Sequence, residues 1–128
     1  MLGIKNLLRR KLKRRENGFT LIELLTVMVV LTVLTTIAIP SVASYRTKSY
    51  NATSYSDLRN MCTAQEVYLI NNPTYAQNVS DLIPYGYNQS PGVTAIIVSA
   101  DTTSYVMTAK HDSGDKTWSV SGPGGTIQ

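Results

Sequence analysis

One acidic residue stands out by its surroundings, because Glu23 is the single charge in an apolar stretch that covers residues 19–39. A carboxylate among leucine, isoleucine and valine side chains is unfavourable unless it is paired or lies near a polar interface. The sequence therefore implies a partner for Glu23. The alternative is an acid at the membrane surface that only favours the N-terminus of its helix. Just before it, Gly18 and Phe19 place a small residue and then a bulky aromatic one at the head of the stretch.

The other residues that could carry chemistry form no catalytic or metal-binding set in the sequence. Cys62 is the only cysteine, which excludes an intramolecular disulfide, and its place on a helical stripe indicates a small buried hydrophobic residue instead of a reactive thiol. His111, the only histidine, is predicted to lie in a solvated turn beside Asp112. Asp112 and Asp115 match no calcium-loop spacing and suit a turn. We therefore expect no catalytic residue, no metal site and no cofactor.

The positive charge of the chain is concentrated at one end. The 128 residues carry a formal net charge of +4, but residues 1–18 hold seven of the twelve basic residues and one acid. The remaining residues have five basic and seven acidic side chains, a net charge of −2. A nucleic-acid partner is therefore not indicated.

The apolar stretch is long enough to cross a membrane. At about 1.5 Å per residue, residues 19–39 extend roughly 32 Å, which matches a hydrocarbon core. The basic residues before it predict that residues 1–18 stay cytoplasmic and that the C-terminal part lies outside. The stretch is too long for a cleaved secretory signal, and no convincing small-x-small site closes it. A twin-arginine signal at Arg14 and Arg15 is disfavoured, because polar residues follow the pair.

Beyond the span, Pro40 predicts a kink, since proline removes one helical hydrogen bond. Residues 41–71 contain no glycine or proline and regain a helical pattern, so one helix is expected from residue 19 to residue 71. Its first part, residues 19–40, is the membrane segment, and its second part must pack against a head domain. The predicted packing stripe is Tyr55, Leu58, Cys62 and Leu69, and the opposite side carries Ser56, Asn60 and Thr63.

The remaining residues predict a connecting loop and a small sheet. Asn72 and Pro73 stop the helix, and residues 72–92, with three prolines and two glycines, are predicted to be a long loop. Three strand-like runs follow, residues 93–99, 104–110 and 116–121, within a sheet-and-tail region of residues 93–128. The first run is apolar on both faces, as in a central strand. Short connectors favour an antiparallel sheet, so the fold class is α+β with one sheet face on the long helix.

The stretch from Glu16 to Leu25, with Gly18, Phe19 and then Thr-Leu-Ile-Glu-Leu behind a basic leader, resembles the type IV filament superfamily. The resemblance continues through residues 37–40, 45–46 and 56–60, and the Gly-Asp-Lys-Thr-Trp ending is similar more loosely. It implies a pilin fold. It also implies that a membrane prepilin peptidase cleaves the Gly18–Phe19 bond and methylates the new amine of Phe19. In this family the acid at the position of Glu23 is thought to neutralise the N-terminal amine of a neighbouring subunit.

By the same resemblance, the precursor waits in the inner membrane with its head outside, surrounded by lipid. Inner-membrane assembly machinery then extracts it into a homo-oligomeric surface filament through the N-terminal helices. Two features depart from the commonest pattern: Thr32 stands where many relatives have glycine, and the 18-residue leader is long. The alternatives are a pseudopilin of a type II secretion system and, outside this class, a signal-anchored monomeric enzyme or sensor.

Overall fold

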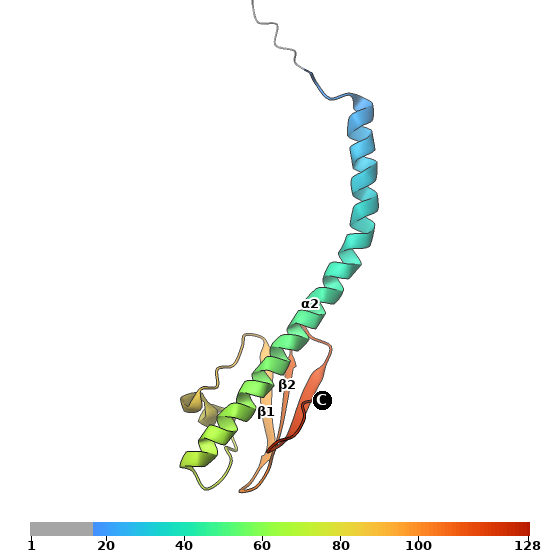
Figure 1. Ribbon diagram of the computed structural model, residues 1–128. Coiled ribbons are helices and arrows are strands. Elements are labelled where there is room, and N and C mark those ends of the chain that lie inside the picture. Colours follow the sequence, from blue (N-terminus) through green and yellow to red (C-terminus); the bar gives the residue numbers. More distant parts are fainter. Residues whose placement is uncertain (1–16) are drawn as a thin grey trace, which may run out of the picture. The chain divides into compact units, whose positions relative to one another are not determined.

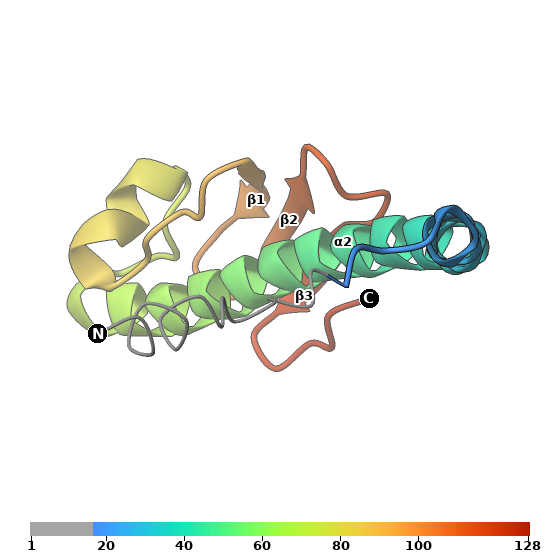
Figure 2. The ribbon, with the colours of Figure 1, turned by 90° about the horizontal axis from the view of Figure 1, so that it is seen from above.

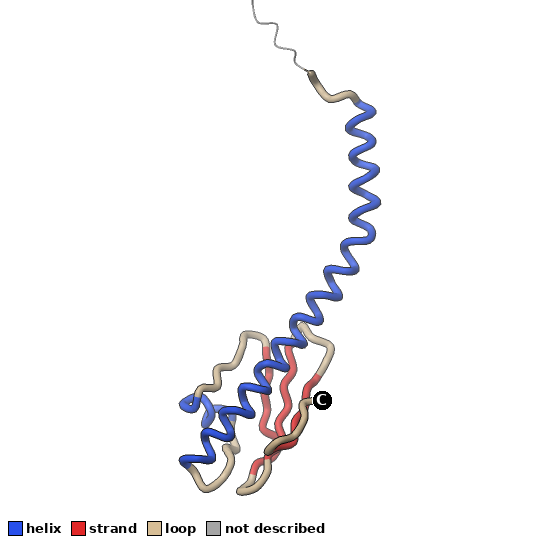
Figure 3. The backbone as a smooth tube through the Cα atoms, in the orientation of Figure 1, coloured by secondary structure: helices blue, strands red, loops and turns tan. Residues whose placement is uncertain are grey.

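The computed structural model describes residues 17–128, so the predictions for residues 1–16, including most of the basic leader, lie outside the described residues. The chain divides between Ala38 and Ile39 into two compact units. One helix, α2 (Leu21–Asn71), contributes to both units (Figures 1 and 3). The second unit, the head, adds the 3-10 helix η1 (Val79–Tyr85) and the strands β1 (Val93–Ala100), β2 (Tyr105–His111) and β3 (Thr117–Gly122).

Helix α2 ends at the predicted residue, Asn71, and begins at Leu21, two residues later than predicted. It continues through Pro40, which lies inside the helix and not at an end of it; a kink at this residue stays a prediction. The side-chain amides of Asn71 and Asn72 donate to the carbonyls of Val67 and Tyr68, at 3.4 and 3.0 Å. These bonds add side-chain donors to backbone carbonyls near the C-terminal end of the helix.

The face of α2 that packs into the head differs from the predicted stripe. The buried residues follow spacings of three and four, as one face of a helix requires, and Leu58 is among them as predicted. Cys62 and Leu69 are only half-buried at the flank of this face. The buried set is Ser54, Asp57, Leu58, Met61, Ala64 and Gln65.

The three strands form an antiparallel sheet in the order β1-β2-β3, which confirms the predicted α+β fold. Tyr105, Met107 and Ala109 of β2 are buried and share a core with Leu58 and Met61 of α2, so one sheet face packs on the helix. The prediction that the first strand is central was wrong, because β1 is an edge strand. Its apolar residues on the second face, Ile96 and Val98, are exposed.

The segment predicted to be a loop, residues 72–92, contains η1. The side chain of Leu82 is fully buried and anchors η1 on the head. Gly86 ends η1 with a φ of 95°, in the left-handed region that favours glycine. The N–H of Gly86 donates to the carbonyl of Ile83, so the turn satisfies the end of the short helix. A polar pair ties this segment to α2, since Gln65 exchanges two hydrogen bonds with the backbone of Ala76, at 2.8 and 2.9 Å.

The two flanks of α2 in the head are covered by different segments. Figures 1 and 2 place η1 on one flank and the C-terminal segment on the other. The C-terminal segment returns along β3, where Gln128 and Ser119 exchange two backbone hydrogen bonds of 2.8 and 3.0 Å. The β3 edge is therefore partly paired.

Candidate functional site

The helix begins with a reciprocal capping arrangement that involves Glu23. The backbone N–H and the hydroxyl of Thr20 both donate to Oε2 of Glu23, each at 2.7 Å. In return, the N–H of Glu23 donates to Oγ1 of Thr20 at 3.2 Å. Thr20 is thus the N-cap and Glu23 the third helical residue of a capping box, which satisfies backbone donors at the helix start. This cap explains why α2 starts at Leu21 and not at Phe19.

The carboxylate of Glu23 keeps one oxygen free of this cap. Both bonds from Thr20 end on Oε2, and within residues 17–128 no hydrogen bond to Oε1 is found. Glu23 lines a hollow of about 410 Å³ together with Phe19, Ile22, Thr26 and Val27. Of the predicted site residues, Phe19 and Glu23 are therefore brought together on one face.

Gly18 precedes this face in a segment outside the helix. Residues 17–20 have no regular secondary structure, and Phe19 is 90% exposed. No atom lies within 4 Å of the position that a Cβ on Gly18 would occupy. The Gly18–Phe19 bond therefore lies in exposed chain before the helix. Pro40, also a predicted site residue, belongs to the other unit.

The first part of α2 exposes all its apolar side chains. Every residue from 17 to 46 is exposed. Among the described residues, α2 is the one helix that is long and apolar enough to cross a membrane, and none of its most apolar window is buried. Such a surface requires lipid or other apolar helices around it.

The hydroxyl groups of the threonines in this segment have hydrogen-bond acceptors within the same helix. Each donates to a backbone carbonyl three or four residues earlier, as Thr26 does to Ile22 at 2.8 Å and Thr32 to Met28 at 2.8 Å. Thr35 and Thr36 do the same. An internal partner of this kind is needed for a polar group that lies in a hydrocarbon environment.

His111 does not lie in a solvated turn, so this prediction was wrong. It is the last residue of β2, is 8% exposed, and stacks on Tyr50 of α2 with ring centroids 4.4 Å apart. Its Nδ1 accepts a hydrogen bond of 3.0 Å from the N–H of Ser113. The alternation of β2, which buries Tyr105, Met107 and Ala109, carries His111 to the same inner face.

Of the acids in the turn after β2, Asp115 holds that turn on α2. Asp115 accepts a hydrogen bond of 2.6 Å from the side-chain amide of Asn51, and Oδ1 of Asn51 accepts from the N–H groups of Asp115 and Lys116. Within the described residues, no group of three or more His, Cys, Asp or Glu side chains is arranged to hold a metal ion. Asn51 was missed by sequence reasoning, because its partners are more than 60 positions away.

Cys62 lies half-buried on the flank of α2 near Tyr105. Burial raises the pKa of the Cys62 thiol, the hydrogen bond with Tyr105 opposes this, and the charge of Glu66 adds to it. A raised pKa reduces the thiolate fraction, which is the nucleophilic form.

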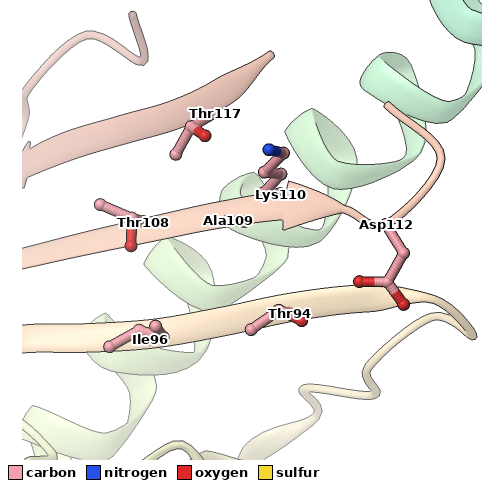
Figure 4. A pocket seen from close by; sticks show the side chains of 7 residues that line it. All are labelled: Thr94, Ile96, Thr108, Ala109, Lys110, Asp112 and Thr117. Carbon is pink, nitrogen blue, oxygen red and sulfur yellow. The ribbon is translucent and has the colours of Figure 1, made fainter. Parts of the chain in front are cut away.

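The outer face of the sheet carries a separate hollow of about 450 Å³. Its lining combines hydroxyl groups with one cation and one carboxylate, which come from all three strands and the turn after β2 (Figure 4). Lys110 and Asp112 are exposed, and no ion pair joins them among the described residues. The arrangement shows no converging catalytic set. The lining residues are Thr94, Ile96, Thr108, Ala109, Lys110, Asp112 and Thr117.

An exposed apolar helix with a capped acid at its start, joined to a small α+β head, is the arrangement of a pilin-like protein. Residues 13–39 match the family model of the prokaryotic N-terminal methylation motif. The chain is 37% identical over 111 residues to the type IV wide pilus major component PilA4 of Thermus thermophilus, which covers 86% of this chain and 84% of that protein. It is also 31% identical over 74 residues to the type II secretion system core protein G of Aeromonas hydrophila. This match covers 56% of this chain and 52% of that protein. The chain belongs to the type IV pilin family.

Proposed function

We propose that this chain is the structural subunit of a type IV pilus, made as a membrane-anchored precursor and polymerised through residues 19–40. The observation that carries the proposal is the apolar part of α2, which is exposed over its whole length and at whose start Glu23 lines one hollow with Phe19, just before the helix. In a membrane this surface contacts lipid, and in a filament it contacts the same surface of other copies. The similarity to a major pilus component supports this function.

Processing is proposed at the Gly18–Phe19 bond, which separates a leader of residues 1–18 from the mature chain. A prepilin peptidase would hydrolyse this bond and add a methyl group to the new amine of Phe19. Two features support the assignment: the bond lies in open chain before the helix, and the methylation motif spans it. Cleavage would leave the cap of α2 intact, because Thr20 and Glu23 both lie after the bond.

Glu23 is proposed to bind the amine of a neighbouring subunit. Cleavage would create a positive charge on Phe19, and this charge would need a partner in the apolar filament core. Oε2 of Glu23 serves its own helix through Thr20, whereas Oε1 is available to an incoming ammonium group. One carboxylate can therefore cap its own helix and bind its neighbour at the same time.

The orientation follows from the basic residues. Seven basic residues within residues 1–18 would hold that end in the cytoplasm, so the head, formed by residues 41–71 of α2, the segment 72–92 and the sheet region 93–128, would lie outside. The partners of the precursor would be lipid, the prepilin peptidase and inner-membrane assembly machinery. Once assembled, the subunit would belong to a cell-surface pilus.

A pseudopilin of a type II secretion system is the second candidate, favoured by the similarity to core protein G. The two functions differ in what accumulates outside the cell. Long surface fibres made of this chain would support the pilus, whereas a calcium site in the head without surface fibres would support the pseudopilin. The relatives are a pilus component and a secretion core component, so neither similarity favours an enzyme.

The test is to shear material from the cell surface, reconstruct any filament, and measure the intact mass of its subunit. We expect fibres of this chain that begin at Phe19 and carry one added methyl group. A subunit that retains the leader would contradict the processing, and fibres made only of other proteins would contradict the pilus function.

A further inference from the structure

A polar face of α2 comes directly after the apolar segment. Spacings of three and four residues place four exposed side chains on one side of the helix, namely Ser41, Ser44, Tyr45 and Lys48. Together with Pro40 they line a hollow of about 340 Å³, and all five residues belong to the second unit. The hollow therefore lies where apolar residues give way to polar ones along the chain.

The hollow offers one positive charge and two hydroxyl groups. Nζ of Lys48 lies 5.6 Å from the centre of the Tyr45 ring, a distance at which a cation and an aromatic ring attract each other. The hydroxyl groups of Ser44 and Tyr45 make no hydrogen bond within the described residues. A ligand that fits this face therefore carries a negative charge and oxygen atoms that accept hydrogen bonds.

The chain itself does not neutralise the charge of Lys48. Between Glu23 and Asp57 the sequence has two basic residues, Arg46 and Lys48, and no acidic residue. The turn after β2 brings Asp115 to Asn51, one turn further along α2, where its carboxylate accepts the amide of Asn51 at 2.6 Å. No ion pair joins Lys48 to any acid in residues 17–128. The ammonium group is thus available to a ligand from outside.

The position along the helix indicates what that ligand is. Residues 41–48 extend about 10 Å along α2, and the headgroup region on each side of a hydrocarbon core is about 5–8 Å thick. When residues 19–40 cross the membrane, this face lies at the level of the outer headgroups. Tyrosine is favoured at that level, and a lysine stem can lie against apolar chains while its ammonium group reaches a phosphate. Ile39 and Val42, in the same turns, are 68% and 51% exposed and suit contact with lipid.

We propose that Ser44, Tyr45 and Lys48 bind the phosphate group of an anionic phospholipid of the outer leaflet. Lys48 supplies the charge, and the two hydroxyl groups donate hydrogen bonds to the phosphate oxygens. The bound lipid holds the precursor at one depth until the subunit leaves the membrane. The inference rests on the proposed function, since it requires residues 19–40 to span the membrane.

Arg46 provides a matched comparison within the same turn. It lies two residues from both Ser44 and Lys48, which at about 3.6 residues per turn puts it on the other side of the helix. Arg46 therefore contacts different lipids at nearly the same depth. A built site depends on Lys48 more than on Arg46, whereas a diffuse attraction between charges depends equally on both.

The test uses the full chain in phosphatidylcholine vesicles that contain a small fraction of a photoactivatable lipid. The probe is phosphatidylglycerol or phosphatidylcholine, each with the same diazirine near the glycerol, and peptide mass spectrometry measures the label on residues 40–50. We expect about fivefold more label from phosphatidylglycerol, since one basic residue near a membrane surface contributes about that factor. Label on residues 1–18 shows in each sample that the probe is active. Equal labelling of residues 40–50 by the two lipids would overturn the proposal.

Three variants locate the selectivity. Lys48→Gln is expected to bring the ratio of the two labels close to one, whereas Arg46→Gln leaves it within about twofold of the unaltered chain. Lys110→Gln removes an exposed lysine from the sheet and is expected to change nothing. Equal losses in Lys48→Gln and Arg46→Gln would assign the selectivity to diffuse attraction and overturn the site.

Two further arms separate the sources of phosphate and the underlying function. Excess inorganic phosphate at constant ionic strength is expected to leave the ratio unchanged, and loss of the ratio would indicate a site for free phosphate and overturn the lipid assignment. A probe with its diazirine deep in the acyl chain is expected to label residues 19–39. Absence of that label would contradict the membrane-anchored precursor, whereas its presence together with equal labelling of residues 40–50 would overturn the lipid site alone.

Discussion

The indole Nε1–H of Trp118 donates a hydrogen bond of 2.8 Å to the backbone carbonyl of Asn51, and so joins β3 to the middle of α2. The side chain of Asn51 extends the same junction to the turn between β2 and β3 through three further hydrogen bonds. The ring of Tyr55, one turn later on α2, meets the indole edge-on with centroids 5.0 Å apart. Asn51 is therefore the residue through which the helix holds the far side of the sheet.

We expect Asn51→Ala to lower the free energy of unfolding of the head by about 1–3 kcal/mol, because three side-chain hydrogen bonds of modest net worth are lost. Urea denaturation of the full chain in detergent, followed by Trp118 fluorescence, measures the change. Asn60→Ala is the matched control, since Asn60 is an exposed asparagine on the same helix and makes no hydrogen bond among the described residues. Equal midpoints for the two variants would contradict the role of Asn51.

The two roles of Glu23 can be separated by the residue that caps it. Thr20→Val removes the hydroxyl of the cap and keeps the carboxylate, so we expect near-normal fibre yield. Glu23→Ala removes the charge, and we expect fibres to be largely lost although the precursor is still inserted and cleaved. Glu23→Gln keeps a hydrogen-bond acceptor without the charge and is expected to be intermediate.

Immunoblots of membrane and sheared fractions distinguish these cases, in cells that express no unaltered subunit. Normal fibre yield from processed Glu23→Ala protein would show that the acid does not determine assembly. A loss in Thr20→Val as large as that in Glu23→Ala would assign the effect to the helix cap and not to the charge.

We expect the folded protein to lose stability at alkaline pH because of a buried tyrosine, Tyr87. Tyr87 is 1% exposed, its hydroxyl has no hydrogen-bond partner in the described part of the chain, and burial, with a smaller contribution from the charge of Asp57, raises its pKa to about 12. The folded protein thus keeps this proton where the unfolded chain, with a pKa of about 10, loses it. The stability is fully present below about pH 10 and is lost as the pH rises toward 12. Burial also raises the pKa of Tyr105, so that residue acts in the same direction.

Urea midpoints measured at pH 8 and at about pH 11.5 check this. We expect Tyr87→Phe to reduce the alkaline loss and to leave neutral stability unchanged or higher, because it removes an unpaired buried hydroxyl. Tyr45→Phe, at a tyrosine that is 68% exposed, is expected to behave like the unaltered chain. An unaltered alkaline loss in Tyr87→Phe would refute the assignment.

Cys62 is expected to react slowly with a maleimide in the folded monomer and fast after unfolding in urea, because it is half-buried and burial raises its pKa. The comparison is Thr63→Cys in a Cys62→Ser background, where the thiol occupies the exposed neighbouring position. Equal rates for the two native proteins would show that the head does not protect Cys62.

The fold was predictable where local pattern decides structure, and less so where distant partners decide it. The end of α2, the three strands and the antiparallel pairing follow from proline, alternation and short connectors, and the structure agrees. The predicted packing stripe of α2 differs from the face that is buried, which includes the polar residues Asp57 and Gln65. These two side chains are buried because they form hydrogen bonds with Ser90 and Ala76 of the following segment. Polar side chains that become core residues in this way carry no apolar signal.

The candidate site was also predictable only in part. Phe19 and Glu23 were expected on one face from helical spacing, and they do line one hollow, although Phe19 lies before the first residue of the helix. The capping role of Thr20 was not anticipated, although its spacing of three residues from Glu23 is that of a capping box. His111 was misplaced because its stacking on Tyr50 joins positions 61 residues apart.

The threonines of the apolar segment bear on how a subunit leaves the membrane. Thr26, Thr32, Thr35 and Thr36 each carry a hydrogen-bond partner within the same helix. Transfer of this segment from lipid into a bundle of helices therefore breaks no hydrogen bond of these hydroxyl groups and requires none to form. On the proposed route from lipid to filament, these hydroxyl groups therefore add no polar cost to the movement of the segment along neighbouring helices.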